Sequence, residues 1–237
     1  MLQYSPRIYY WEPVAESDRP VIALIKGDKY SLLFDACNSR RHAMEVRDSI
    51  RQNNLPEPDF IVISHAHLDH WFGLSRFRGV SFCSQKTLNI IENKILQDWS
   101  IESVHRRVLE GTEHPMTEQM LNIEYGTEQR EIELRTPDIG ISESMTFQLG
   151  GIHCSFQYVG GNHAEDSAVL YVVEEKLLLL GDILYIRENN LQIIEDLYKT
   201  IKDYHAEYYI DSHENKIYDN QDLDSLIEEM RTNNTGI

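Results

Sequence analysis

The run His65-Ala66-His67-Leu68-Asp69-His70 constrains this chain more than any other part of its 237 residues. Three imidazoles and one carboxylate within six positions cannot all lie on one side of a regular helix or strand. They converge only where the chain turns sharply and a bound group holds the side chains together. A divalent transition metal accepts this mixture of donors. The sequence therefore predicts a site for one metal ion or two at this loop.

The residues that precede this run predict how it is held. Phe60-Ile61-Val62-Ile63 is an apolar stretch that follows two prolines, Pro56 and Pro58, and it is typical of a short buried strand. The histidine run then begins at the end of that strand, in a loop. We therefore expect the other ligands of the site to follow other strands, so that all of them meet at one edge.

Three downstream residues occupy such positions, in order along the chain. His163 follows a predicted strand, Asp182 follows the apolar run 177–181, and His213 follows the strand 208–211. Imidazole and carboxylate donors suit Zn²⁺, Mn²⁺ or Fe²⁺, and no cysteine joins the set to enforce zinc. Two such ions can share a hydroxide whose pKa falls toward neutrality and which attacks an electrophilic carbon or phosphorus.

The remaining segments show the periods of strands and helices. Strands are expected at 8–11, 21–26, 30–34, 80–83, 152–158, 168–173 and 176–180. Helices are expected at 39–51, 191–204 and 220–231, and a further helix is expected to begin near residue 85, with an apolar stripe that reaches Trp99. Residues 100–140 are charged and are interrupted by Pro115, Gly126 and Pro137. We interpret them as a helical insert or lid.

The chain contains an internal repeat. Residues 21–35 and 168–182 each contain a strand, a charged turn, a second strand and an aspartate, and they align without a gap. At nearly the same offset, 60–65 aligns with 208–213, and both segments end in Ser-His. Two blocks in the same order favour a duplicated half-domain with facing sheets. Such an arrangement brings both Ser-His ends and Asp182 to one rim.

Composition restricts the class of protein. The chain is long enough for one large domain and short for two, and its net charge of −17 opposes binding to nucleic acid backbones and anionic membranes. The three cysteines are scattered, and the first residues lack the basic start and apolar stretch of a secretory signal, so we expect a cytoplasmic protein. The expected partner is a small-molecule substrate, with no nucleic acid and no membrane, and homodimerisation stays open.

Together with the three downstream residues, the histidine run resembles the metal motifs of the metallo-β-lactamase superfamily, in its dinuclear branch. The resemblance extends over nearly the whole chain. It implies an α+β fold, an αβ/βα four-layer sandwich in which two mixed sheets face each other, with helices outside and the metals at one edge. Residues 1–237 would form a single domain, with about 84–145 as a helical insert or lid that shapes the active site.

The resemblance also implies an assignment of metal ligands. One metal takes His65, His67 and His163, the other takes Asp69, His70 and His213, and Asp182 bridges the two. The expected cofactor is two Zn²⁺, with Mn²⁺ or Fe²⁺ as alternatives. Asp69 binds through one oxygen and can orient the nucleophile with the other, which makes it a catalytic residue as well. Asp35 matches an aspartate of the family's first motif, and we interpret it as a group that fixes the loop.

The sequence departs from the family pattern on the substrate side. Phe72 stands where the family usually has a glycine, and we interpret it as packing against the next helix. Asn162 and Glu165 differ from the family's third motif, which weakens the transfer of a substrate class. Asp182 argues against the true β-lactamases, which generally lack an aspartate there. Tyr185 resembles, by its offset from Asp182, a tyrosine of the lactonase branch that donates a hydrogen bond to the substrate carbonyl.

These observations predict a metal-dependent hydrolase that uses a metal-bridging hydroxide to cleave a small ester, thioester or lactone, with Asp69 and Tyr185 as catalytic residues. A phosphodiesterase acting on a small phosphate ester is one alternative, because the same metals suit attack at phosphorus. An oxidoreductase that resembles the mononuclear-iron persulfide dioxygenases is another. A metal-binding protein without activity is the non-enzymatic alternative.

Overall fold

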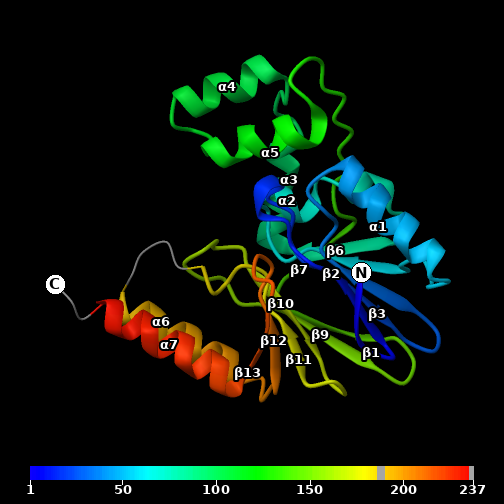
Figure 1. Ribbon diagram of the computed structural model, residues 1–237, viewed down its shortest axis with the longest axis vertical. Coiled ribbons are helices and arrows are strands. Elements are labelled where there is room, and N and C mark those ends of the chain that lie inside the picture. Colours follow the sequence, from blue (N-terminus) through cyan, green and yellow to red (C-terminus); the bar gives the residue numbers. More distant parts are fainter. Residues whose placement is uncertain (186–189, 235–237) are drawn as a thin grey trace.

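The fold is built from two mixed β-sheets that face each other, with helices on the outer side of both (Figure 1). The computed structural model describes residues 1–185 and 190–234. The first sheet contains, in this order, β1 (Leu2–Ser5), β2 (Ile8–Trp11), β3 (Ile22–Lys26), β4 (Ser31–Phe34), β5 (Phe60–Val62), β6 (Val80–Ser84) and β7 (Ile139–Ile141). Neighbouring strands are antiparallel from β1 to β4 and parallel from β4 to β7.

The second sheet follows later in the chain. It contains, in this order, β13 (Ile217–Asp219), β12 (Tyr208–Ile210), β11 (Leu177–Leu179), β10 (Ala168–Val172), β9 (His153–Tyr158) and β8 (Ser144–Gln148). Strands β11 and β12 are parallel, and the other neighbouring pairs are antiparallel. The helices are α1 (Arg40–Gln52), α2 (Leu68–Trp71), α3 (Gln85–Lys94), α4 (Ile101–Leu109), α5 (Pro115–Tyr125), α6 (Leu191–Lys202) and α7 (Asn220–Asn234), with the short 3₁₀ helices η1 (Ala15–Ser17) and η2 (Leu74–Arg76).

Three apolar clusters hold the layers together. Leu177 and Leu179 of β11 lie in the cluster between the sheets, with Leu32 of β4. Leu178, between them in sequence, lies in the cluster that α6 and α7 cover, and α1, α2 and α3 contribute to a third cluster on the first sheet. A strand that is buried on both faces has an unbroken apolar sequence, which is why this segment could be predicted. The expected four-layer αβ/βα sandwich is confirmed.

The two halves of the chain repeat one local topology. A hairpin (β3–β4 or β10–β11) is followed by a helix (α1 or α6) and by a strand parallel to the second hairpin strand (β5 or β12). Equivalent hydrogen bonds join the halves, because Ala168 N donates to Ser64 O at 2.8 Å and Val21 N donates to Ser212 O at 2.7 Å. The arrangement supports the duplicated half-domain inferred from the sequence.

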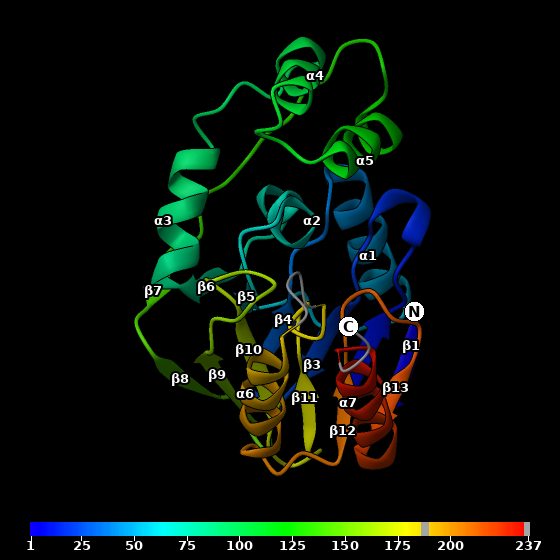
Figure 2. The same cartoon turned by 90° about the vertical axis from the view of Figure 1, so that its left-hand side faces the viewer.

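Helices α3, α4 and α5 follow β6, and in Figure 2 α3 rises beside α2 while α4 and α5 lie beyond it, farther from the sheets. The helices expected in this region are present, but β7 also falls within 84–145. Helix α3 ends at Lys94, so Trp99 does not continue its stripe. Trp99 lies instead in the loop before α4, where Ser100 caps the new helix by accepting a hydrogen bond from Ser103 N. Strands β1, β7 and β13 were not expected, and each is a short edge strand.

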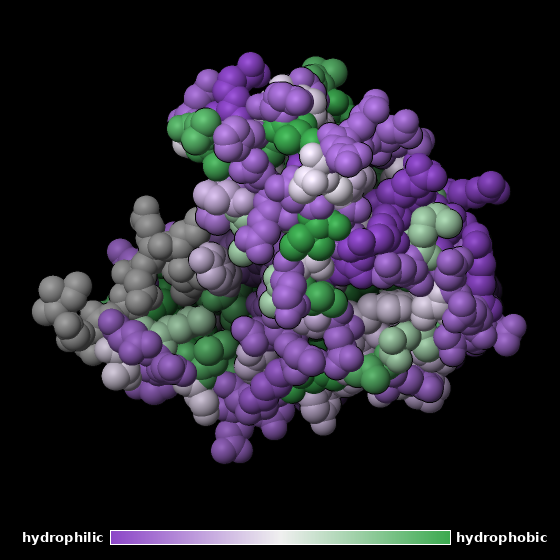
Figure 3. Space-filling view, turned by 45° about the horizontal axis from the view of Figure 1, so that its top comes forward, coloured by the Kyte–Doolittle hydropathy of each residue, from purple (hydrophilic) through white to green (hydrophobic). Residues whose placement is uncertain are grey.

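The outer surface is mostly hydrophilic on the face that Figure 3 shows, with hydrophobic side chains gathered in small areas. This agrees with 39 acidic residues in the sequence against 22 lysines and arginines. Within residues 1–185 and 190–234, no helix has the length and apolar character needed to cross a membrane.

Candidate metal centre

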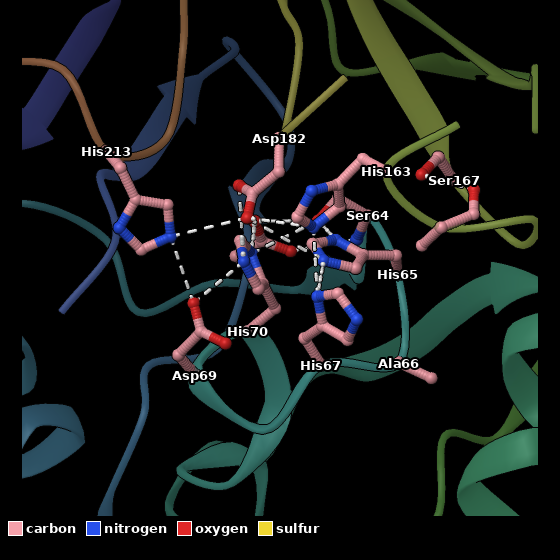
Figure 4. Close-up of polar contacts among 12 residues, drawn as sticks. Ser64, His65, Ala66, His67, Asp69, His70, His163, Ser167, Asp182 and His213 are labelled. Carbon is pink, nitrogen blue, oxygen red and sulfur yellow. Dashed lines mark hydrogen bonds and ion pairs between the residues drawn. The ribbon is translucent and has the colours of Figure 1, made fainter. Parts of the chain in front are cut away.

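Seven polar side chains from both sheets converge at one edge of the sandwich (Figure 4). From the first sheet come two histidines of the loop after β5 and two residues of α2, a single turn that begins directly after His67. From the second sheet come residues that lie before β10, after β11 and after β12. They are His65, His67, Asp69, His70, His163, Asp182 and His213. The structure thus brings together all of the predicted ligands.

The first group of donor atoms belongs to His65, His67, His163 and Asp182. His67 Nδ1 lies 2.8 Å from His65 Nε2 and 2.9 Å from His163 Nε2. Asp182 Oδ2 lies 3.3 Å from His163 Nε2 and 3.8 Å from His65 Nε2. Three imidazole nitrogens and one carboxylate oxygen therefore face a common point, as the ligands of a transition metal do.

The second group belongs to Asp69, His70, Asp182 and His213. Asp69 Oδ2 lies 2.9 Å from His70 Nε2 and 3.1 Å from His213 Nε2. Asp182 Oδ1 lies 3.4 Å from His70 Nε2, and its Oδ2 lies 3.4 Å from His213 Nε2. Within each group the donor atoms lie within 4.8 Å of one another, and Asp182 is common to both. The two groups coincide with the two ligand sets that the resemblance implied.

The surroundings of His70 show that these residues fit a bound cation. Its Nδ1 donates a hydrogen bond to Asp35 Oδ2 at 2.7 Å, so Nε2 of the neutral imidazole carries a lone pair. Among the described residues Nε2 is buried without a hydrogen-bond partner, and it faces oxygens of Asp69 and Asp182. A buried lone pair opposite two carboxylates is unfavourable unless a positive charge lies between them. A metal ion would satisfy all three groups at once.

Asp35 and Ser64 hold the imidazoles in place from behind. Asp35 accepts hydrogen bonds from Ser64 N at 2.8 Å and from Ser64 Oγ at 3.0 Å. Ser64 Oγ lies 3.0 Å from His65 Nδ1 and 3.2 Å from His70 Nδ1. These contacts fix the ring orientations and leave Asp35 outside both ligand groups. The interpretation of Asp35 as a loop-fixing residue is confirmed.

Asp166 joins the ligand loop to α3. Its Oδ2 accepts hydrogen bonds from Ala66 N at 2.8 Å and from Thr87 Oγ1 at 2.9 Å, and its carbonyl accepts one from Ser84 Oγ at 3.1 Å. The side chain is 3 % exposed. Asp166 therefore ties the sharp turn between His65 and His67 to the start of the neighbouring helix.

Two carboxylates beside His213 were not expected from the sequence. Asp18 Oδ1 lies 3.8 Å from His213 Nδ1, and Asp211 accepts a hydrogen bond from His213 N at 3.0 Å. Burial raises the pKa of Asp18 to about 6 and that of Asp211 to about 7. Asp211 lies only two residues before His213, so its place near the site could have been inferred from the sequence. Asp18 lies far away in the sequence, and nothing in its local pattern points to the site.

The imidazoles fall into two electrostatic classes. Burial lowers the pKa of His65 well below its usual value and that of His67 to about 3, so both rings are neutral and ready to bind a metal. Burial acts in the same direction on His70 and His213. There the carboxylates of Asp69 and Asp182 outweigh it and raise the pKa, to about 11 for His213. Protons therefore compete with a metal more strongly at the second group.

Two aromatic residues near the centre have different surroundings. The ring of Tyr185 lies edge-on to that of His163 with 5.5 Å between centroids, and the residue is 67 % exposed. Tyr185 therefore lies at the rim of the first group. Phe72 is buried and meets the rings of Trp71 and Trp99, each with 5.0 Å between centroids. Its interpretation as a packing residue is confirmed.

The fold and the site together define a metal-binding protein of the αβ/βα sandwich class, with five histidines and two aspartates at one edge of its sheets. The sequence matches the family model of the metallo-β-lactamase superfamily over residues 19–231, and the chain therefore belongs to that superfamily. The family inferred from the histidine run and the downstream residues is thus confirmed.

Individual relatives are distant. The metallo-β-lactamase type 2 of Bacteroides fragilis is 20% identical over 181 residues, which are 65% of this chain and 70% of that protein. A metallo-β-lactamase from Pontibacter korlensis shares 16% identity with a TM-score of 0.64 and 97% coverage of both chains. A metallo-β-lactamase family protein from Thermus thermophilus shares 18% identity with a TM-score of 0.66, covering 98% of this chain and 81% of that one. These structural likenesses show a common fold.

Proposed function

We propose that the protein is a hydrolase with two bound Zn²⁺ that cleaves a small ester, thioester or lactone. The observation that carries the proposal is the position of Asp182, whose carboxylate belongs to both groups of donor atoms. A carboxylate shared in this way suits two ions held side by side. The donors are nitrogen and oxygen atoms, so Mn²⁺ or Fe²⁺ would also suit the site.

Two ions bound here would supply an activated water and a positive charge that polarises the substrate carbonyl. The role of the protein is to position side chains around these two ions. The contacts of Asp69 with His70 and His213 both use Oδ2. Its Oδ1 is therefore the atom that we assign to orienting the attacking water and accepting its proton. The buried network of Asp35 and Ser64 keeps the imidazoles from turning as charge develops.

Tyr185 supplies the second catalytic role in this proposal. Its ring stands beside His163 at the exposed rim, where a substrate can reach it. A phenol hydroxyl can donate a hydrogen bond to the oxygen of a carbonyl under attack, and this stabilises the tetrahedral oxyanion. The role fits a carbonyl substrate, which is why we place esters, thioesters and lactones before phosphate esters.

The test combines metal analysis with a panel of substrates. Protein purified without added metal is expected to contain two zinc or manganese ions per chain and to turn over a thioester, an ester or a lactone faster than an aryl phosphodiester, a cyclic nucleotide or a β-lactam. Asp182→Asn should lower both the metal content and kcat/KM, the latter by about 100-fold or more, because it weakens both groups of ligands.

Asp138→Asn is a matched control for this variant. Asp138 accepts hydrogen bonds from Ser81 N and Oγ, both at 2.8 Å, at the start of β6 and away from the ligand loop. The control should keep its metal and its activity. An Asp182→Asn variant with full activity and both metals would remove the basis of the proposal. A single iron per chain would favour the persulfide dioxygenase alternative, and preferential cleavage of phosphodiesters would favour the phosphodiesterase.

A further inference from the structure

One cationic side chain outside the family's ligand motifs, Lys94, belongs to α3, the helix that Asp166 joins to the metal loop. Lys94 is the last residue of α3, seven positions after Thr87 and three after Ile91, so the three residues share one face of the helix. Thr87 Oγ1 donates a hydrogen bond to Asp166, which in turn holds the ligand loop at Ala66 N. The face of α3 that carries Lys94 is therefore the face turned toward the metal loop.

The end of α3 is also fixed beside α2. Trp99 Nε1 donates a hydrogen bond to the carbonyl oxygen of Lys94 at 3.2 Å. The ring of Trp99 meets the ring of Phe72, the residue that follows α2, edge to face. Through Trp99, the C-terminal end of α3 is therefore tied to the residue that follows α2, the helix that carries Asp69 and His70.

The electrostatic effects of Lys94 agree with this position. Burial lowers its pKa, whereas the carboxylates of Glu113, Asp166 and Asp69 raise it. In return, the ammonium group helps burial to lower the pKa of His67. These directions agree with a place for Lys94 on the side of α3 that faces the loop of His67.

None of the described residues pairs with the ammonium group of Lys94. Among the described residues, no carboxylate forms an ion pair with it and no side chain or backbone oxygen accepts a hydrogen bond from it. The guanidinium of Arg107, by contrast, already has partners. Its Nη1 donates a hydrogen bond to Asp98 O at 2.7 Å, and its Nε lies 3.7 Å from a carboxylate oxygen of Glu113. The guanidinium also stacks over the ring of Trp99, 4.8 Å from the centroid. A half-buried cation that no described residue pairs, on the helix face turned toward the metal loop, is suited to hold an anion.

We propose that Lys94 binds a carboxylate group of the substrate, so that the preferred substrate is an ester, thioester or lactone that carries a carboxylate near the carbonyl under attack. The inference rests on the proposed function and specifies its substrate class. A monoanionic carboxylate is favoured over a phosphate dianion, because the carboxylates of Glu113, Asp166 and Asp69, which raise the pKa of the lysine, would repel the second charge. A lysine is a point charge, which also suits a single carboxylate.

Paired substrates test this inference directly. The 4-nitrophenyl monoester of succinate carries a free carboxylate, and 4-nitrophenyl butyrate is its neutral counterpart. We expect the wild-type protein to prefer the monoester of succinate and Lys94→Met to lose about 10–100-fold in kcat/KM on it, mainly through KM, with less than about a twofold change on the butyrate. Lys94→Arg should keep most of the preference. The phosphate-bearing ester of the same length should be a poorer substrate than the carboxylate.

Lys86→Met is the matched control on the same helix. Its ammonium group lies 3.6 Å from Glu165 and over the ring of Tyr158, with half of the side chain exposed. This variant should keep the preference, and metal analysis should give the same content in all four proteins. A Lys94→Met variant that retains the full preference for the carboxylated ester overturns the inference and leaves the proposed function intact. So does an equal loss on both esters, which would indicate a general disturbance of the site.

Calorimetry separates the inference from the proposed function. Titration of the zinc-loaded protein with glutarate should give a dissociation constant about tenfold or more higher for Lys94→Met than for the wild type. If neither ester is hydrolysed, the proposed function fails. The difference in the dissociation constant for glutarate between wild type and Lys94→Met still tests whether Lys94 binds a carboxylate. Weaker glutarate binding by the variant then supports the carboxylate site, and equal binding overturns it.

Discussion

At the scale of single residues, Asp35 and Asp182 occupy equivalent positions in the two halves of the chain and have different roles. Both follow the second strand of a hairpin, β4 or β11. The oxygens of Asp35 accept hydrogen bonds from Ser64 and His70, whereas Asp182 faces imidazole nitrogens of four histidines. These hydrogen bonds hold Asp35 outside both groups of donor atoms, whereas Asp182 belongs to both. The same turn therefore supplies, in the first half, a carboxylate that fixes the metal loop (Asp35) and, in the second half, a ligand shared by both groups (Asp182).

Tyr185 allows a prediction at this scale. We expect Tyr185→Phe to lower kcat on ester, thioester or lactone substrates by about 100-fold, because the ring stays beside His163 and only the hydroxyl donor is lost. Metal content should not change. Steady-state kinetics and metal analysis measure both effects, and Tyr30→Phe, at another exposed tyrosine, serves as control. A rate on carbonyl substrates equal to that of the wild type would assign Tyr185 to packing.

At the scale of elements, helix α1 illustrates how a local signal and a buried polar group coexist. Ser39 caps the helix by accepting a hydrogen bond from His42 N at 3.0 Å, and Ala43, Val46 and Ile50 form the buried face. The imidazole of His42 is buried too, and among the described residues its Nδ1 has no hydrogen-bond partner. Burial lowers the pKa of His42 to about 3. The folded protein therefore favours the neutral form of this ring.

His42 links the stability of the protein to pH. Its pKa is about 6.5 in an unfolded chain and about 3 in the folded one. The stability that the neutral ring contributes is complete above about pH 6.5 and is lost as the pH falls toward 3. Between pH 7.5 and 5.0, wild-type protein should lose about 2 kcal/mol more free energy of unfolding than His42→Met.

Urea denaturation at the two pH values measures this difference. Protonation of the metal ligands affects wild type and variant alike, so it cancels in the comparison. His105→Met on α4, where the imidazole is exposed, should behave as the wild type does. Parallel pH profiles for wild type and His42→Met would show that His42 is not the group responsible.

The elements that could be predicted from the sequence are those with a complete local pattern. The apolar run before Asp182 is buried on both faces, and α1 has both a cap and an apolar stripe. Strands β7 and β13 have three residues each and lie at sheet edges, so their pattern is too short to stand out. The apolar spacing in the sequence runs on to Trp99, but α3 ends at Lys94 and Ser100 caps the next helix. The periodicity of apolar residues alone therefore does not show where a helix ends.

At the scale of the whole molecule, the predicted ligands share one physical property: each follows or precedes a buried strand, so the sheet order places it. The side chains that complete the site come from elsewhere. Asp18 reaches His213 from the loop around η1, and Lys94, whose charge lowers the pKa of His67, lies at the end of α3. Their positions depend on how the halves and the helices pack. A single sequence does not contain that information in any local pattern.

The distribution of ligands over both halves leads to a prediction about the entire fold. His65, His67, Asp69 and His70 come from the first sheet and α2, and His163, Asp182 and His213 come from the second sheet. Bound metal therefore joins the two halves at their common edge. A metal at 1,000 times its dissociation constant stabilises the folded state by about 4 kcal/mol per site.

Removal of the metal should therefore lower the melting temperature by about 10 °C or more, since 1 kcal/mol corresponds to about 2–4 °C in a chain of this length. Differential scanning calorimetry before and after treatment with a chelator, followed by addition of Zn²⁺, measures the change and its reversal. Asp182→Asn should show a smaller shift, because it binds less metal at the start. Equal melting temperatures with and without the metal would mean that the two sheets hold their common edge through the apolar core and the Ala168–Ser64 and Val21–Ser212 hydrogen bonds alone.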